Sequence, residues 1–236
     1  MNAVRTASLF DVHTLVRLYR TYADDLRIAR EAQRELLTQY PLKPKLDDIE
    51  AELTYLAIRE ARPSTVVELG SFHGWSTTWI LRALRDNGEG RLVSFDRVDH
   101  ARRNVPPSLS EGRWTFVSGD ARLHLHRLPP APGYVFVDAA HTARFARWYT
   151  ERVLPRLAAG TPVSVHDVFH GRRPWPGSEG RVLLRWLGER GIGWVTASAA
   201  ADPDLHERLV GLKRKLGLSA PVHGSHRNPM LFFQTP

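Results

Sequence analysis

Acidic side chains follow successive apolar runs of this sequence, each at or just past the end of its run: Glu68, Asp96, Asp120, Asp138 and Asp167. One acid in such a place means little, because Asp and Glu are common in turns. Five in succession predict one rim lined with carboxylates. His141 and His166 accompany the last two acids, and imidazole transfers protons near neutral pH with little adjustment of its pKa. The pattern indicates a site that combines hydrogen-bond acceptors for a ligand with groups able to bind a cation or move a proton.

Strand and helix patterns alternate between these residues. Short apolar runs predict seven strands, at 65–69, 91–96, 114–118, 134–138, 161–167, 192–196 and 230–233. Helical patterns lie between them, at 75–85, 121–128, 142–157 and 181–190. Such alternation predicts an α/β, Rossmann-like fold, with a mostly parallel seven-stranded sheet and helices on both faces. Ligands of such sheets bind beyond the carboxyl ends of the strands, where the acids lie.

The first forty residues predict helices in front of this sheet. Apolar residues recur there at helical spacing: Leu15, Leu18, Tyr19, Tyr22 and Leu26. A proline-containing break at 40–44 ends the pattern, and Asp47 or Asp48 caps the next helix. We therefore expect an N-terminal helical extension over residues 1–46, acting as a lid or as the surface of a homo-oligomer, and one α/β domain over residues 47–236.

Composition excludes several classes of protein. A chain of 236 residues with 42% hydrophobic content suffices for one domain and is short for two. It contains no cysteine, which excludes disulfides and thiolate metal sites. The net charge is +8, but only four of the 33 basic residues are lysines and the arginines are spread along the chain, so a nucleic-acid partner is not expected. No apolar run approaches the roughly 18 residues of a membrane span, and Met1–Phe10 lacks the apolar core of a secretory signal, so we expect a cytoplasmic protein without membrane contact.

Gly70 and Gly74 flank a predicted strand-to-helix turn. Glycines there let the backbone approach a ligand closely, and the following helix offers free N–H groups. The turn is neither the G-x-G-x-x-G of dinucleotide-binding proteins nor a P-loop. Glu68 within it suits a cationic amino group better than a pyrophosphate. Asp96, at the end of the next strand, can accept hydrogen bonds from a ribose diol.

These segments resemble the motifs of class I S-adenosylmethionine (SAM)-dependent methyltransferases. Residues 66–77 are similar to their motif I in the E-[IL]-G-S-x-x-G-x-S-T form, which is common among small-molecule O-methyltransferases of bacterial secondary metabolism. Residues 95–96 resemble the family's ribose-binding acid, and residues 117–121 its G-D-[AS] motif. Residues 136–141 resemble its D-x-x-H segment. The resemblance covers roughly residues 47–170 in the correct order and extends weakly to 227–233.

The resemblance implies a cofactor-binding role for each matching residue. Asp96 would bind the ribose of SAM, and the adenine would lie against Gly119, Asp120 and Ala121. The motif I residues would hold the methionine part or border it: Glu68, Gly70, Ser71, Gly74 and Ser76.

The resemblance also implies a metal site. In catechol-type methyltransferases, Mg²⁺ is bound by the Asp of the D-x-x-H segment and by an acid pair one strand later, and it lowers the pKa of the acceptor hydroxyl. Asp138, His166 and Asp167 occupy those places here, so Mg²⁺ or another divalent cation is expected. The histidine departs from the pattern, because imidazole suits softer metals. His141 or His166 could instead be the general base, and both interpretations stay open at this point.

A long loop at 168–180 follows the last of these motifs. Phe169 and Trp175 could wall an acceptor pocket, His170 could face the substrate, and Arg172 or Arg173 could pair with an acidic substrate. The sequence thus predicts methyl transfer to a hydroxyl of a small molecule. Two alternatives remain: an N- or RNA methyltransferase, which the absence of an Asn/Asp-Pro-Pro-Tyr tetrad disfavours, and a non-catalytic subunit with a SAM fold.

Overall fold

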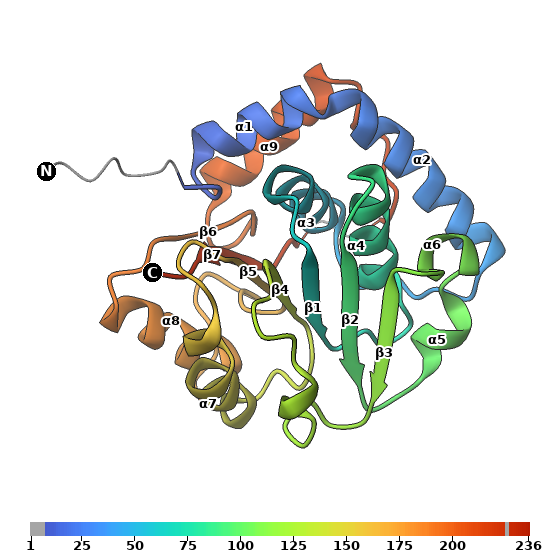
Figure 1. Cartoon of the computed structure of the whole chain (residues 1–236). Helices are drawn as coiled ribbons and strands as arrows, with labels where there is room; N and C mark the ends of the chain where they lie inside the picture. The colour runs from blue at the N-terminus through green and yellow to red at the C-terminus, as the bar shows by residue number, and fades with distance from the viewer. Residues whose placement is uncertain (1–7, 225–226) are drawn as a thin grey trace, which may run out of the picture.

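The computed structural model describes residues 8–224 and 227–236; residues 1–7, part of the N-terminal segment interpreted above, lie outside this description. Its centre is a seven-stranded sheet in the order β3-β2-β1-β4-β5-β7-β6 (Figure 1). Every pairing is parallel except those of β7, which is antiparallel to both neighbours. The predicted fold is confirmed. The strands are β1 (Thr65–Leu69), β2 (Arg91–Asp96), β3 (Trp114–Ser118), β4 (Tyr134–Val137), β5 (Pro162–Val165), β6 (Trp194–Thr196) and β7 (Leu231–Gln234).

The middle strands β4 and β5 consist mostly of apolar residues because both of their faces are covered. Every residue of β4 and β5 is buried, as is usual for strands inside a parallel sheet. Side chains of β1 alternate between two hydrophobic clusters: Val66 packs with α3 and α4, whereas Val67 and Leu69 pack with α7 and α8. This alternation decides which way the acid between them, Glu68, points.

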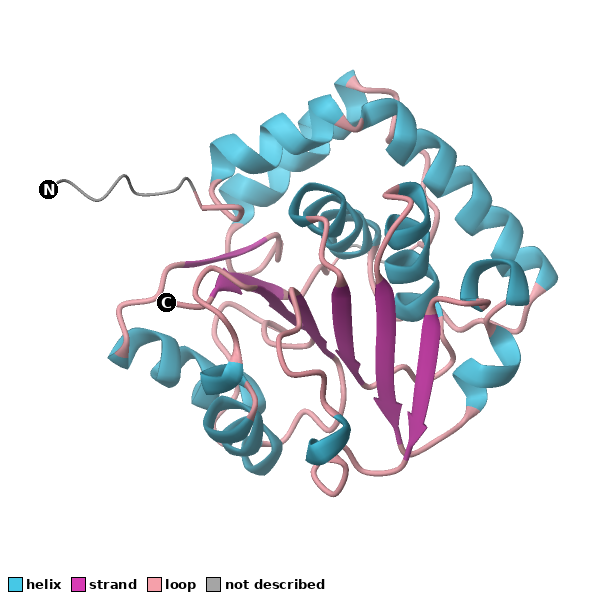
Figure 2. Ribbon diagram, in the orientation of Figure 1, coloured by secondary structure: helices cyan, strands magenta, loops and turns pink. Residues whose placement is uncertain are grey.

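Helices cover both faces of the sheet (Figure 2). One face is covered by α3 (Asp48–Ala61) and α4 (Trp75–Asp86). The short helices α5 (His100–Asn104) and α6 (Pro107–Ser110) lie near β3. An outer layer arches over α3 and α4 and consists of α1 (Val12–Thr21), α2 (Ala23–Gln39) and α9 (Pro203–Lys215) (Figure 1). The opposite face carries α7 (Ala143–Arg152) and α8 (Glu179–Glu189). Within the described ranges no helix is both long and apolar enough to cross a membrane.

The N-terminal helices share the core of the sheet. Buried apolar residues of α1 and α2 belong to the same cluster as those of α3, α4 and α9. A buried carboxylate joins three of these helices: Glu52 on α3 accepts hydrogen bonds from Tyr19 Oη at 2.8 Å and Lys213 Nζ at 2.7 Å, and pairs with Arg30. Residues 8–46 are therefore packed as a layer of the same core.

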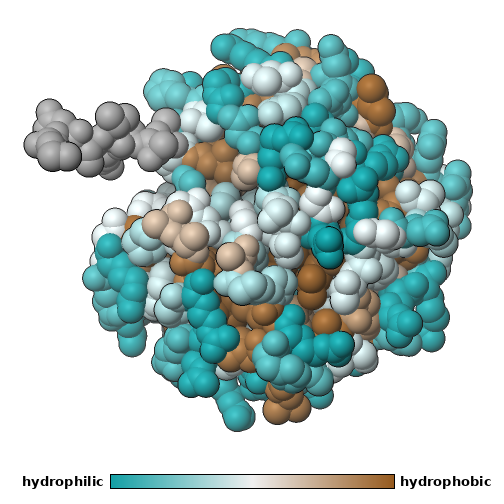
Figure 3. Space-filling view, in the orientation of Figure 1, coloured by the Kyte–Doolittle hydropathy of each residue, from teal (hydrophilic) through white to brown (hydrophobic). Residues whose placement is uncertain are grey.

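The exterior is mostly hydrophilic. Figure 3 shows hydrophilic residues over the outer helices of one face, with apolar residues in small patches between them. On α2 the large apolar side chain most open to solvent is Ile28, at 67% exposure. The N-terminal helices expose little apolar surface that could form an interface. The homo-oligomer through these helices stays a prediction.

Two predicted helices are shorter than expected. Residues 121–128 form turns and a single 3₁₀ turn (η1, Leu125–Arg127), because the Asp120 side chain binds the backbone N–H of Arg122 and Pro129 follows. The predicted helix at 142–157 ends as α7 at Arg152 and continues as a 3₁₀ turn (η2, Leu154–Arg156), since Pro155 cannot extend an α-helix.

Candidate active site

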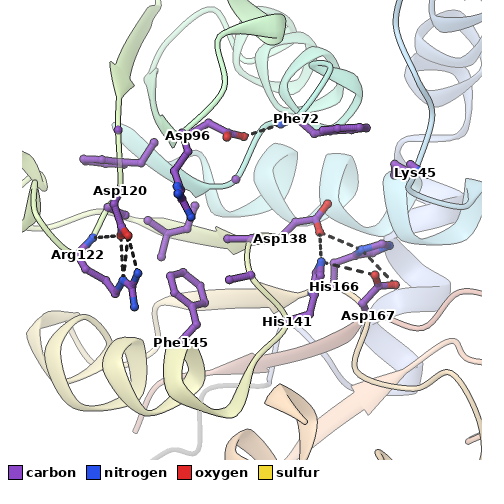
Figure 4. Close-up of a pocket in the computed structure, with 18 residues that line it drawn as sticks. Lys45, Phe72, Asp96, Asp120, Arg122, Asp138, His141, Phe145, His166 and Asp167 are labelled. Carbon is purple, nitrogen blue, oxygen red and sulfur yellow. Dashed lines mark hydrogen bonds and ion pairs between the residues drawn. The ribbon is translucent and has the colours of Figure 1, made fainter.

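A cavity of about 450 Å³ opens at the carboxyl ends of β1 to β5 (Figure 4). This volume is within the range of small-molecule sites. The residues that line it come from the turns after the strands, from α7 and from the segment before α3. Nine residues predicted for the site are among them: Gly70, Asp96, Gly119, Asp120, Ala121, Asp138, His141, His166 and Asp167.

The turn after β1 needs glycine at both of its ends. Gly70 has φ +90°, and a Cβ there would coincide with the carbonyl oxygen of Asp138. Gly74 has φ +92°, and a Cβ there would lie 2.7 Å from a methyl carbon of Val105. Both positions combine left-handed backbone with close contact, so the turn packs directly on the end of β4.

Glu68 lies beneath this turn and does not line the cavity. Its carboxylate is fully buried and accepts hydrogen bonds from the hydroxyls of Ser76 at 2.6 Å, Thr77 at 2.9 Å and Ser94 at 2.5 Å. Burial raises the pKa of Glu68 to about 7, although these hydroxyls oppose the shift. The geometry favours a role in joining the turn to α4 and β2 over the predicted contact with the amino group of SAM.

Asp96 is bound to the turn and still faces the cavity. Its Oδ2 accepts from the backbone N–H groups of Ser71 and Phe72, both at 2.7 Å, and its Oδ1 accepts from Val98 N at 3.0 Å (Figure 4). Each carboxylate oxygen has two lone pairs, so capacity remains for a ribose hydroxyl. Ser71 and Ser76 border a smaller neighbouring pocket.

The opposite end of the cavity carries an ion pair that the sequence analysis did not anticipate. Arg122 binds Asp120 through Nε–Oδ1 at 3.0 Å and Nη2–Oδ2 at 2.6 Å. This pair lowers the pKa of Asp120 to about 2. Arg97 lines the same end, so two cations border the place predicted for the adenine.

Four ionisable side chains converge near the end of β4 (Figure 4). Asp138 Oδ1 lies 3.2 Å from His166 Nδ1 and 3.3 Å from His141 Nε2. Asp167 Oδ1 lies 3.5 Å from His166 Nδ1, and its Oδ2 lies 3.6 Å from His141 Nε2. Each imidazole thus lies between the two carboxylates that the sequence predicted to converge.

The other ring nitrogen of each imidazole faces a buried glutamate. Glu50 Oε2 lies 3.4 Å from His166 Nε2, an ionic approach without the alignment of a hydrogen bond. Glu179 Oε2 lies 3.2 Å from His141 Nδ1. Burial lowers the pKa of both histidines, but the carboxylates outweigh it, raising the pKa of His141 to about 10 and that of His166 well above its ordinary value. The surrounding carboxylates therefore favour the protonated form of both rings.

Comparisons with known proteins agree with this fold. A family model described as a methyltransferase domain matches residues 67–168. Residues 67–168 thus form a methyltransferase domain. No curated protein matches the sequence.

Solved methyltransferases share the fold across most of the chain. The O-methyltransferase from Bacillus cereus, solved in complex with SAH, is 14% identical and superposes with a TM-score of 0.61 over 96% of this chain and 100% of that chain. TomG from Streptomyces achromogenes is an O-methyltransferase involved in tomaymycin synthesis, solved with SAM. It is 19% identical, with a TM-score of 0.58 over 90% of this chain and 89% of that one.

The divalent cation predicted for Asp138, His166 and Asp167 stays a prediction, because the described side chains do not surround a metal position. Both ring nitrogens of His141 and of His166 face carboxylates. Across residues 8–224 and 227–236, no three or more His, Asp or Glu side chains are arranged to hold a metal ion. The other prediction, a histidine general base, also stays a prediction.

Strained backbone gathers at the methyltransferase's cavity. In the described ranges five non-glycine residues have positive φ, and three of them line the cavity: Phe72 (φ 43°), His141 (φ 45°) and Asp167 (φ 56°). Such conformations are unfavourable for L-residues and persist where the surrounding structure imposes them. The packing around the site therefore fixes where His141 and Asp167 point.

The predicted substrate-binding residues lie outside the cavity. Phe169 is buried in the core and stacks on Trp194, with ring centroids 5.4 Å apart. His170 is the nearest, with Nε2 at 3.7 Å from Asp167 Oδ1, and the exposed Trp175 packs beside it. Arg172 is exposed on the same loop.

Several residues at the methyltransferase site were missed by sequence reasoning. Lys45, Phe72, Arg97, Arg122 and Phe145 line the cavity. Glu50 and Glu179 touch its histidines from outside it. A capping box, with Asp47 and Glu50 three residues apart, was a readable signal for Glu50's place on α3, but nothing local indicated its contact with His166.

Proposed function

We propose that the protein transfers the methyl group of SAM to a hydroxyl oxygen of a small molecule, and that two imidazolium ions stand where catechol-type methyltransferases use a divalent cation. The observation that carries this proposal is the placing of His141 and His166 between Asp138 and Asp167 at one end of a cofactor-sized cavity. Two neighbouring carboxylates need a compensating positive charge, and the imidazolium ions supply it.

The cavity offers a partner to each part of SAM. Asp120 and Ala121 border the end proposed for the adenine, and Asp96 lies between that end and the histidines. Lys45 lies at the end near Asp138, where its ammonium group is suited to the cofactor's carboxylate (Figure 4). Lys45 is also the residue of the predicted extension 1–46 that reaches this cavity.

When bound, SAM supplies a methyl group whose bond to sulfur breaks, leaving the electron pair on sulfur, as the bond to the acceptor oxygen forms. His141, at 37% side-chain exposure, is accessible from the cavity, and as an imidazolium it stabilises negative charge on that oxygen. Asp167, at 27% exposure, is placed to accept the hydroxyl proton. Asp138 holds both imidazoles in position.

Calorimetry on the purified protein tests cofactor binding. We expect SAM and its demethylated product to bind with dissociation constants on the order of micromolar, and Lys45→Met to weaken SAM about tenfold by removing one charge pair. Adenosine, which has no carboxylate, should bind both proteins equally. Lys215→Met, an exposed lysine at the end of α9, is the matched control. Binding of a nicotinamide dinucleotide without binding of SAM would contradict the proposal.

The pH profile separates the imidazolium proposal from the metal and base alternatives. Because the pKa of His141 is raised from 6.5 to about 10, its ion pairs are complete below about pH 6.5 and are lost as pH rises through about 10. Turnover and melting temperature should both hold near neutral pH and fall on the alkaline side, and His141→Gln should remove that alkaline step. Loss of turnover after chelation, with recovery in Mg²⁺, would favour the metal; a fall on the acidic side near the ordinary imidazole pKa would favour the base.

A further inference from the structure

We propose that Glu50 and Glu179 are positioning residues, each holding one histidine of the site in its orientation from the side away from the cavity. The inference rests on the proposed function only in regarding those histidines as catalytic. Both glutamates lie outside residues 67–168, the segment that matches the methyltransferase family model. They therefore connect the site to the parts of the chain on either side of that segment.

Glu50 connects His166 to two distant elements. Its carboxylate is fully buried; Oε2 accepts from Asp47 N at 2.9 Å, and Oε1 accepts from Met230 N at 2.6 Å. These two N–H groups belong to the start of α3 and the residue before β7, so they fix the carboxylate firmly. Oε2 then lies 3.4 Å from His166 Nε2, while Asp138 holds the other ring nitrogen. Carboxylates facing opposite nitrogens of the ring favour one orientation of it.

Glu179 depends on its histidine more than Glu50 does, because His141 is the main partner of its carboxylate. It is 2% exposed and stands in the first turn of α8, where the helix dipole favours a carboxylate. Its Oε2 lies 3.2 Å from His141 Nδ1, and its Oε1 has no hydrogen-bond partner among the residues that the structure describes. A carboxylate buried with so few partners is unfavourable unless a charge compensates it. His141 is the histidine placed to compensate it.

The two contacts have the same geometry on opposite sides of the site. In each, a glutamate faces the ring nitrogen directed away from Asp138, and Asp138 faces the other nitrogen. Partners behind a functional histidine commonly fix its ring orientation, and their loss commonly lowers function. The alternative is that Glu50 only caps α3 and Glu179 only stabilises the start of α8. That alternative predicts changes in stability alone.

NMR of the histidine ring nitrogens separates the positioning role from the purely structural one. The full-length protein is labelled with ¹⁵N at histidine and measured without substrate. The signals are assigned with His141→Gln and His166→Gln. Glu50→Gln keeps an oxygen for the backbone N–H groups but removes the charge; we expect it to displace the ring resonances of His166 and leave those of His141 in place. Glu179→Gln should do the converse.

Glu52→Gln is the matched control, because Glu52 is equally buried on the same helix but pairs with Arg30 and Lys213 away from the site. It should lower the melting temperature and move neither histidine. Unchanged ring resonances in Glu50→Gln and Glu179→Gln, or equal displacement in Glu52→Gln, would overturn the proposal. SAM affinity is measured on the same proteins: if the wild type fails to bind SAM, the proposed function fails, and the NMR result still decides the roles of the glutamates.

Discussion

Asp138→Asn is expected to lower the rate of methyl transfer about 10²- to 10³-fold, the size of effect seen when a preorganised electrostatic partner is removed from an active site. The asparagine has the same shape, so the cavity keeps its form. The carboxylate that it replaces is shared by His141 and His166, at 3.3 Å and 3.2 Å, and both imidazolium ions lose their common partner. One substitution thus releases both rings.

The same substitution should change stability in a pH-dependent way. Burial raises the pKa of Asp138, but His166 and His141 outweigh it and hold the pKa well below its ordinary value of 3.8. A carboxylate with a lowered pKa stabilises the fold above its ordinary pKa, and this contribution is lost on acidification. At neutral pH, Asp138→Asn should cost on the order of 3 kcal/mol of unfolding free energy, because it leaves buried charge without a partner.

These effects are measured as SAH formation with a panel of small hydroxylated acceptors and as melting temperature between acidic and neutral pH. Asp99→Asn is the control, because Asp99 is half-exposed and pairs with Arg103 on the surface. An Asp138→Asn protein with nearly normal turnover would rule out the central role given to this carboxylate.

Gly70→Ala is expected to abolish SAM binding, with a loss of affinity beyond about a hundredfold, or to prevent folding altogether. The added Cβ would clash with the carbonyl oxygen of Asp138, which is a backbone atom and not the end of a flexible side chain. The φ of +90° adds strain for any residue with a side chain. Any relief requires the turn to separate from β4, and that movement displaces both the cofactor turn and Asp138.

Gly171→Ala serves as the matched control for Gly70→Ala. Gly171 lies in the loop after β5, has no positive φ, and a Cβ there meets nothing within 4 Å. We expect it to bind SAM as the wild type does. Circular dichroism and calorimetry on both proteins decide the matter, and normal SAM affinity in a folded Gly70→Ala protein would show that the turn is not as tightly packed as described.

The sheet and its binding edge were predictable because their signals are local. Each strand is a short apolar run, and a parallel arrangement brings the residues after those runs to one edge. Asp96, Asp120, Asp138 and Asp167 reached the cavity for that reason. Glu68 did not, although the alternation of side chains along β1 contained the signal: Val67 and Leu69 face α7 and α8, so the residue between them faces α4.

The remaining part of the site depends on packing between distant segments. Glu50 and His166 are 116 positions apart, and Glu179 and His141 are 38 apart. No local sequence pattern predicts which helix end packs against which histidine. The sequence predicted neither glutamate, and their carboxylates help to raise the pKa of His141 and of His166.

The placing of β7 has a consequence for how the protein is made. This strand comes last along the sheet-forming part of the chain, yet it lies between β5 and β6 and pairs with both. During synthesis, a nascent chain that has emerged as far as β6 contains every residue of the cavity but leaves the edge of β5 unpaired, and an unpaired edge invites association with other chains. Glu50 also lacks the N–H of Met230 at that stage. The surroundings of His166 are therefore complete only after residues 230–234 have left the ribosome.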